Sequence, residues 1–181
     1  MTATETKLKG CFVIEPTLFN DPRGYFFESF NQSKFNELIG KTVDFVQDNE
    51  SFSSKGALRG LHFQTGEYAQ AKLVRVVKGT VLDVVVDIRK NSPTFSKHFS
   101  IELSEDNKNQ LFIPRGFAHG FIALSDTATF SYKCDNFYHR ASERGIRHDD
   151  PFLSIDWKLP KESRIISEKD LVLPTLSNID L

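Results

Sequence analysis

Short runs of β-branched and aromatic residues, each followed by a turn signal, dominate this sequence. Lys78-Gly79 and Pro114-Arg115-Gly116 are typical of the turns between them. Helical crossovers of about 10–15 residues do not separate the runs, which argues against a parallel sheet covered by helices. The pattern predicts a mainly β fold with a few short helices, and we favour an antiparallel jelly roll. The predicted strands are residues 12–16, 42–46, 72–77, 80–88, 98–103, 110–113, 119–124 and 127–132.

One short helix is expected near the N-terminus. An apolar face around Phe35 predicts a helix over residues 31–39, with Asn31 or Ser33 as the N-cap and Gly40 as the stop. No repeat or linker divides the 181 residues, so we expect a single domain over 1–181. Its C-terminal segment, about 151–181, contains prolines that interrupt any regular period, and we expect it to wrap the barrel and complete a site.

Charge and apolar content narrow the classes of function. The formal net charge is only −1, so no overall basic field attracts nucleic acid or an anionic membrane. The polar N-terminus and short apolar runs favour a cytoplasmic protein, and we read Cys11 and Cys134 as buried thiols. Seventeen phenylalanines exceed what one small core needs, which predicts a homodimer.

Two carboxylates stand in an apolar strand over residues 81–88. Alternation puts Asp83 and Asp87 on one face and apolar side chains on the other. If the apolar face packs between sheets, the carboxylates face solvent. If that face contacts another element, Asp83 points into the barrel and needs a partner, for which Lys72 on the neighbouring strand is a candidate.

His62 lies in a strand-like segment with polar neighbours. A lone histidine in a strand is more often structural than catalytic, but Arg59, Gly60 and Gln64 are close by. In a regular strand Arg59 and His62 face opposite ways. Either Gly60 marks a bulge or the two side chains serve separate purposes.

His119 follows a turn that resembles the second metal motif of cupins. A metal cupin also needs a first motif with two histidines and a carboxylate, and here His62 stands alone. We therefore expect no metal, and we interpret His119 as a hydrogen-bonding group for substrate or as a core histidine. Tyr132 ends a strand, where a tyrosine is usually a packing residue. It becomes a stronger candidate for a catalytic acid if it lies near a histidine base.

Several motifs in order resemble one family, the dTDP-4-dehydrorhamnose 3,5-epimerases. The resemblance covers roughly residues 7–173. The motifs are Asp21-Pro22-Arg23-Gly24, Phe45 to Asn49, Leu58 to Gln64, Ala71 to Arg75, Ile113 to Gly120, Asp149 to Pro151, Ile155 to Trp157 and Ser167 to Asp170. The resemblance implies a dimeric jelly roll of the cupin kind without metal or other cofactor, which inverts C3 and C5 of a 4-keto-6-deoxy sugar on dTDP.

The resemblance also implies roles for individual residues. His62 is the base, oriented by Asp170, while Tyr132 is the acid on the opposite face of the sugar and Lys72 stabilises the enolate oxygen at C4. Tyr138 is expected to stack near the nucleotide. The implied substrate-binding residues are Arg23 and Glu28, which the partner subunit is expected to supply, and Gln47, Asp48, Asn49, Arg59, His119, Tyr138, Glu143 and Lys169.

Two alternatives remain open. An epimerase that inverts only C3 or only C5 would share the same base and acid. A non-catalytic barrel that binds sugar nucleotides would keep the arginines but could lose His62, Tyr132 or Asp170, and all three are present.

Overall fold

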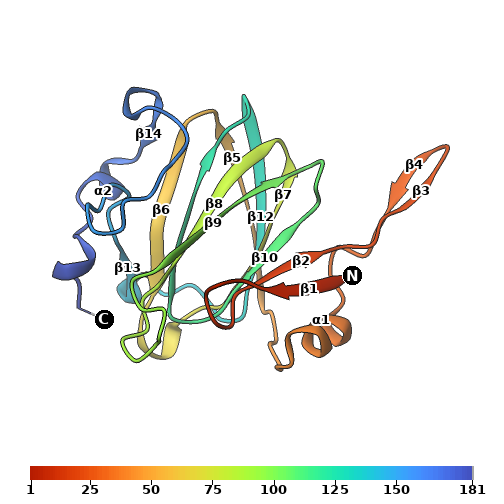
Figure 1. The fold of residues 1–181 in the computed structure, drawn as a ribbon, viewed down its shortest axis with the longest axis horizontal. Helices are drawn as coiled ribbons and strands as arrows, with labels where there is room; N and C mark the ends of the chain where they lie inside the picture. Colours follow the sequence, from red (N-terminus) through yellow and green to blue (C-terminus); the bar gives the residue numbers. More distant parts are fainter. Residues whose placement is uncertain (181) are drawn as a thin grey trace.

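A computed structural model describes residues 1–180. Strands account for most of the regular structure, as the sequence predicts (Figure 1). The strands are β1 (Thr2–Glu5), β2 (Phe12–Glu15), β3 (Phe19–Asp21), β4 (Gly24–Phe26), β5 (Gln47–Ser54), β6 (Ala57–Gln64), β7 (Lys72–Lys78), β8 (Thr80–Asp87), β9 (His98–Ser104), β10 (Gln110–Ile113), β11 (Phe117–Ala123), β12 (Thr127–Cys134), β13 (Glu143–Gly145) and β14 (Ile165–Ile166). The α-helices are α1 (Gln32–Ile39) and α2 (Glu168–Leu171), and short 3-10 turns cover Gly66–Tyr68, Arg140–Ser142, Lys161–Ser163 and Leu176–Asn178.

Two sheets of six strands make the body of the molecule. The first sheet has the order β1-β2-β10-β7-β12-β5, and the second has the order β13-β6-β11-β8-β9 with β14 added beside β6. All pairings are antiparallel except β14 with β6. The result is a jelly roll of the cupin kind, which confirms the predicted fold class. None of the helices in residues 1–180 is long and apolar enough to cross a membrane.

Strand β8 is buried on both faces because two cores meet across it. Val81 and Val85 belong to the core between the sheets, while Leu82 and Val84 belong to a second core on the outer face. The second core also contains Trp157 and other residues of the C-terminal segment, which packs against the outside of the second sheet (Figure 1). This outer layer explains why the carboxylates of β8 point inward rather than to solvent.

Asp87 shows how an inward carboxylate is satisfied. It is fully buried and accepts hydrogen bonds from the side chains of Arg89, Ser92 and Thr94. Burial alone would raise its pKa, but these donors hold it at about 2. The solvent-facing alternative for Asp83 and Asp87 is therefore wrong, and the partner of Asp87 is an arginine from the following loop.

The predicted helix is confirmed, and one predicted strand is wrong. Asn31 is the N-cap and accepts the Lys34 amide, and Gly40 ends α1 with φ +65°. Residues 42–46, which were predicted as a strand, carry no strand pairing, and the strand begins at Gln47 instead. β5 is polar on its inner face because that face borders a cavity. A search for runs of apolar residues therefore did not detect this strand.

Candidate active site

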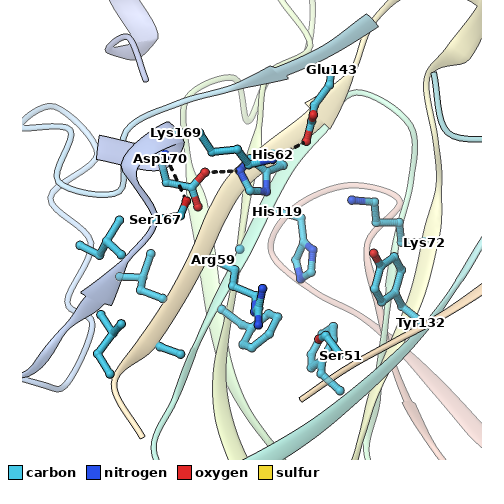
Figure 2. Close-up of a pocket in the computed structure, with 17 residues that line it drawn as sticks. Ser51, Arg59, His62, Lys72, His119, Tyr132, Glu143, Ser167, Lys169 and Asp170 are labelled. Carbon is cyan, nitrogen blue, oxygen red and sulfur yellow. Dashed lines mark hydrogen bonds and ion pairs between the residues drawn. The ribbon is translucent and has the colours of Figure 1, made fainter. Parts of the chain in front are cut away.

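A cavity of about 540 Å³ opens between the two sheets (Figure 2). One wall comes from β6 and β11 of the second sheet, and the other comes from β5, β7 and β12 of the first. A neighbouring cavity of about 320 Å³ shares His62, Lys72, Tyr132 and Glu143 with it. The four shared residues therefore lie where the two spaces meet.

His62 on β6 is held by a carboxylate from the far end of the chain. Its Nε2 lies 2.7 Å from Oδ1 of Asp170, which is buried in α2 (Figure 2). The other oxygen of Asp170 accepts the Gly60 amide at 3.2 Å. Burial raises the Asp170 pKa, but the hydrogen bonds from His62 and Gly60 outweigh it and hold the pKa below its ordinary value. An ionised Asp170 thus fixes the orientation of the His62 ring.

A bulge in β6 brings Arg59 to the same cavity as His62. His62 is paired with His119, but Arg59 is paired with Phe121, so β6 has one residue more than β11 in this interval. Gly60 lies at the irregularity with φ +118°, and an added Cβ there would approach the Gly120 Cα to 2.6 Å. The prediction that Gly60 marks a bulge is therefore confirmed, and Arg59 and His62 face the same cavity.

His119 on β11 forms a second histidine–carboxylate pair next to the first. Its Nε2 lies 2.8 Å from Oδ2 of Asp83 on β8, and both side chains are almost fully buried. The predicted partner of Asp83, Lys72, forms no ion pair with any residue among 1–180. Asp83 therefore has a partner, but it is the histidine that the sheet register brings beside it.

Lys72 and Tyr132 occupy the opposite wall (Figure 2). The strands β7 and β12 are neighbours, and Lys72 Nζ lies 5.8 Å from the centre of the Tyr132 ring. Burial lowers the Lys72 pKa and raises the Tyr132 pKa from their ordinary values. Tyr132 therefore stays protonated, and Lys72 loses its proton more readily than an exposed lysine.

Residues at the border of the two cavities are linked by hydrogen bonds. The Tyr138 hydroxyl donates to Glu143 at 3.0 Å, and Lys169 Nζ lies 3.2 Å from the other Glu143 oxygen. Gln47 accepts the Tyr138 amide and donates to Asn49, which lines the smaller cavity with it. The predicted binding residues Gln47, Asn49, Arg59, His119, Tyr138, Glu143 and Lys169 therefore line one or both cavities.

Three predicted binding residues lie outside both cavities of this chain. Arg23 is in the β3–β4 hairpin, which projects from the body, and pairs with Asp21 (Figure 1). Glu28 pairs with Lys34 of α1. Asp48 points to the outer face of β5, where it pairs with Lys133.

Sequence reasoning missed one polar side chain at the cavity and one pairing beside it. Ser51 on the inner face of β5 lines it, and the interaction of Asp83 with His119 fixes a second ring there. The alternation of polar residues over 47–53 was the available signal for Ser51. Among residues 1–180, no cluster of three or more His, Cys, Asp or Glu side chains could hold a metal ion.

This arrangement suits proton transfer next to a carbonyl group. A histidine oriented by a carboxylate can remove a proton, a lysine can stabilise the enolate oxygen, and a protonated tyrosine on the facing wall can return a proton. The fold and the site therefore define a class of jelly-roll enzymes that move protons on either side of a bound molecule.

Comparison with known proteins identifies the family. The family model for dTDP-4-dehydrorhamnose 3,5-epimerase matches residues 5–178. The Escherichia coli dTDP-4-dehydrorhamnose 3,5-epimerase is 53% identical over 180 residues, which cover 99% of this chain and 96% of that protein. The chain belongs to the dTDP-4-dehydrorhamnose 3,5-epimerase family.

Solved structures agree with this assignment. The crystal structure of the Elizabethkingia anophelis dTDP-4-dehydrorhamnose 3,5-epimerase has a TM-score of 0.97 and 55% identity, and the match covers 100% of this chain and 99% of that one. A Legionella pneumophila epimerase in complex with dTDP-4-keto-L-rhamnose has a TM-score of 0.95 and 47% identity, covering 99% and 94% of the two chains.

Proposed function

We propose that this enzyme inverts C3 and C5 of dTDP-4-dehydro-6-deoxy-D-glucose to give dTDP-4-dehydro-L-rhamnose, a step of dTDP-L-rhamnose biosynthesis. The observation that carries the proposal is the placement of the His62–Asp170 pair and of Tyr132 with Lys72 on facing walls of one cavity. Family membership and the ligand named for the Legionella pneumophila structure support the choice of substrate.

The reaction begins with removal of a proton next to the C4 ketone. His62 takes the proton from carbon, and its new charge is stabilised by Asp170, whose lowered pKa keeps it ionised. The electrons left on carbon move to the C4 oxygen and form an enolate. Lys72 stabilises that negative charge strongly because burial leaves its ammonium poorly hydrated.

Inversion requires a proton from the other face of the sugar. Returning the proton from His62 would restore the starting configuration. Tyr132 lies on the wall opposite His62 and keeps its proton because burial raises its pKa. Donation from Tyr132 to carbon reforms the ketone with inverted configuration. Solvent then takes the proton from His62 and returns one to Tyr132, so that the same groups act once at C3 and once at C5.

The remaining cavity residues hold the nucleotide sugar. Arg59 supplies a cation for the diphosphate, and His119, fixed by Asp83, donates or accepts a hydrogen bond with the sugar. Tyr138 is more than half exposed at the cavity border, as expected of a side chain that stacks on the thymine base. Gln47, Asn49, Glu143 and Lys169 surround it. Asp48 points outward in this chain, and we propose that it also binds substrate.

We also propose a homodimer in which the β3–β4 hairpin reaches the partner's cavity. The hairpin exposes Phe19, Tyr25 and Phe26 by more than half, which is apolar area that a partner would cover. This arrangement would bring Arg23 and Glu28 to the second site. Sedimentation equilibrium tests the assembly, and a monomer at micromolar concentration would contradict it.

The chain is proposed to act as one domain in the cytoplasm. The C-terminal segment supplies Asp170 to His62, so the barrel and its wrapping segment form one functional unit. Cys11 and Cys134 are both buried and unpaired, which agrees with a reducing compartment.

The proposed function is tested by identifying the product. Purified protein treated with EDTA is mixed with dTDP-4-keto-6-deoxyglucose in D2O, and a reductase traps the product for NMR. We expect deuterium at both C3 and C5 and formation of dTDP-L-rhamnose. Label at one carbon alone would indicate a single-centre epimerase, and no label would reject the proposed reaction.

A further inference from the structure

Two loops meet beside the smaller cavity, and Tyr138 lies on one of them. The first loop covers residues 65–71 after β6, and the second covers residues 135–139 after β12. The Tyr68 ring of the first loop stacks on the His139 ring of the second, with 3.9 Å between the ring centres. The two loops are therefore in direct contact next to Tyr138, which lines the smaller cavity.

Side chains, and not strand pairing, hold the backbone around Tyr138. Gln47 on β5 accepts the Tyr138 amide at 3.1 Å. Gln70 donates to the Asn136 carbonyl at 2.8 Å. Among residues 1–180, neither Phe137 nor Tyr138 makes a hydrogen bond to another backbone group. Because buried backbone groups need partners and no strand supplies them here, the place of Tyr138 depends on these side chains.

Gln64, the last residue of β6, connects the two loops. It is only 7% exposed, and its Nε2 donates to the carbonyls of Tyr68 at 2.8 Å and Phe137 at 3.2 Å. Its Oε1 accepts the His139 amide at 2.6 Å. The bonded groups of Phe137 and His139 stand immediately before and after Tyr138 in the chain. Gln64 therefore holds the second loop on both sides of Tyr138 and ties it to the first.

The groups proposed to move protons are not bonded to Gln64. His62 lies two positions earlier on β6 and is held by Asp170, and Tyr132 lies on the facing wall. All three hydrogen bonds of the Gln64 side chain go to the backbone of the two loops. A change at Gln64 should therefore affect binding at the Tyr138 end of the site and leave proton transfer in place.

We propose that Gln64 is a positioning residue that fixes Tyr138 for stacking on the thymine base of the nucleotide sugar. It acts through the loop backbone and does not itself touch the substrate. Since a buried amide that donates twice and accepts once allows little movement, the Tyr138 ring is held in place before the nucleotide binds. The inference rests on the proposed function, because it assumes a dTDP-linked substrate and the Tyr138 stack.

The Gln64→Glu variant tests this role. It keeps the size of the side chain and the acceptor for His139, but a carboxylate cannot donate to the two loop carbonyls. We expect KM for the nucleotide sugar and Kd for dTDP to rise about tenfold, as for loss of two neutral hydrogen bonds, while kcat stays within about twofold. Gln64→Met, which has similar volume and cannot hydrogen-bond the loops, should give the same pattern.

Asn107→Asp is the matched control. It makes the same change from amide to carboxylate in the loop between β9 and β10, where Asn107 donates to the Glu102 carbonyl and lines neither cavity. Its kcat, KM and Kd for dTDP should equal those of the parent protein. Thermal unfolding checks that each variant folds, and Gln64→Met replaces Gln64→Glu in the comparison if the latter does not fold.

A double-mutant cycle tests whether Gln64 acts through Tyr138. In a Tyr138→Ala background, the Gln64 substitution should change Kd for dTDP by about twofold or less. Unchanged dTDP binding in the folded Gln64 variants would overturn the proposal, as would a fall in kcat as large as the rise in KM, or an undiminished effect without Tyr138. If the parent protein failed to bind dTDP, or if Tyr138→Ala bound it equally well, the proposed function would fail instead, which keeps the two results distinct.

Discussion

The two walls of the cavity prepare their polar groups in opposite ways. On the wall of β6 and β11, His62 and His119 each contact a buried carboxylate, at 2.7 and 2.8 Å. On the facing wall, Lys72 and Tyr132 have no carboxylate partner among residues 1–180, and burial shifts both of their pKa values. Orientation thus governs the first wall, while desolvation governs the second.

This difference matches the two halves of the proposed reaction. A base needs a fixed ring and a nearby carboxylate that stabilises its protonated form. An enolate needs a charge that is not already neutralised, and the final proton needs a donor that remains protonated at neutral pH. A carboxylate paired with Lys72 would neutralise its charge and weaken its stabilisation of the enolate.

Loss of the base should have the largest effect. His62→Ala should lower kcat by about three or more orders of magnitude, because general-base catalysis is removed. Binding of dTDP should stay within about tenfold, since the base acts in the transition state rather than on the nucleotide. Turnover is followed with the reductase-coupled assay. An equal loss of dTDP binding would instead make His62 a structural residue.

Asp170 and Asp83, which contact His62 and His119, should differ in their effect on catalysis. Asp170→Asn should reduce kcat by about 100-fold, because His62 loses the group that orients it and stabilises its positive charge. Asp83→Asn should reduce kcat/KM by only about tenfold, since His119 is proposed to bind substrate rather than to transfer protons. The two variants are compared in the same assay. A larger effect from Asp83→Asn would reverse the assignment of the two pairs.

Lys72, on the wall formed by β5, β7 and β12, should determine the alkaline limit of activity. Burial lowers the pKa of Lys72, so it loses its proton at a lower pH than an ordinary lysine. As pH rises, kcat should therefore begin to fall before pH reaches 10.5, the ordinary lysine pKa. Tyr132 does not cause this fall, because its pKa is raised. The Lys72→Arg variant keeps its charge and should lack this limb of the profile, whatever its absolute rate. Identical alkaline limbs in the two proteins would contradict the role of Lys72.

Local patterns predicted the fold better than they predicted the pairings. Asn31 and Gly40 bounded α1 correctly because helix caps depend on neighbouring residues alone. Asp83 was linked to Lys72 across a hairpin, yet its partner is His119, which only the lateral order β11-β8 brings beside it. Sheet order is a property of the whole chain, and no local pattern contains it.

The candidate site was incomplete for the same reason. His62 and Asp170 meet across 108 positions in the sequence because the C-terminal segment packs on the outer face of the sheet. Their pairing followed from the family resemblance and not from the spacing. Ser51 escaped notice because a serine in a polar strand looks like a solvent-facing residue until the cavity beside it is known.

Hydrogen exchange by the Tyr132→Phe variant tests the division between the two walls most directly. The variant is incubated with dTDP-4-keto-6-deoxyglucose in D2O, and NMR follows both the deuterium content and the configuration at C3 and C5. Exchange should continue, because His62 and Lys72 remain, while inversion should fall at least about 100-fold. Full inversion without Tyr132 would contradict the claim that the facing wall supplies the second proton.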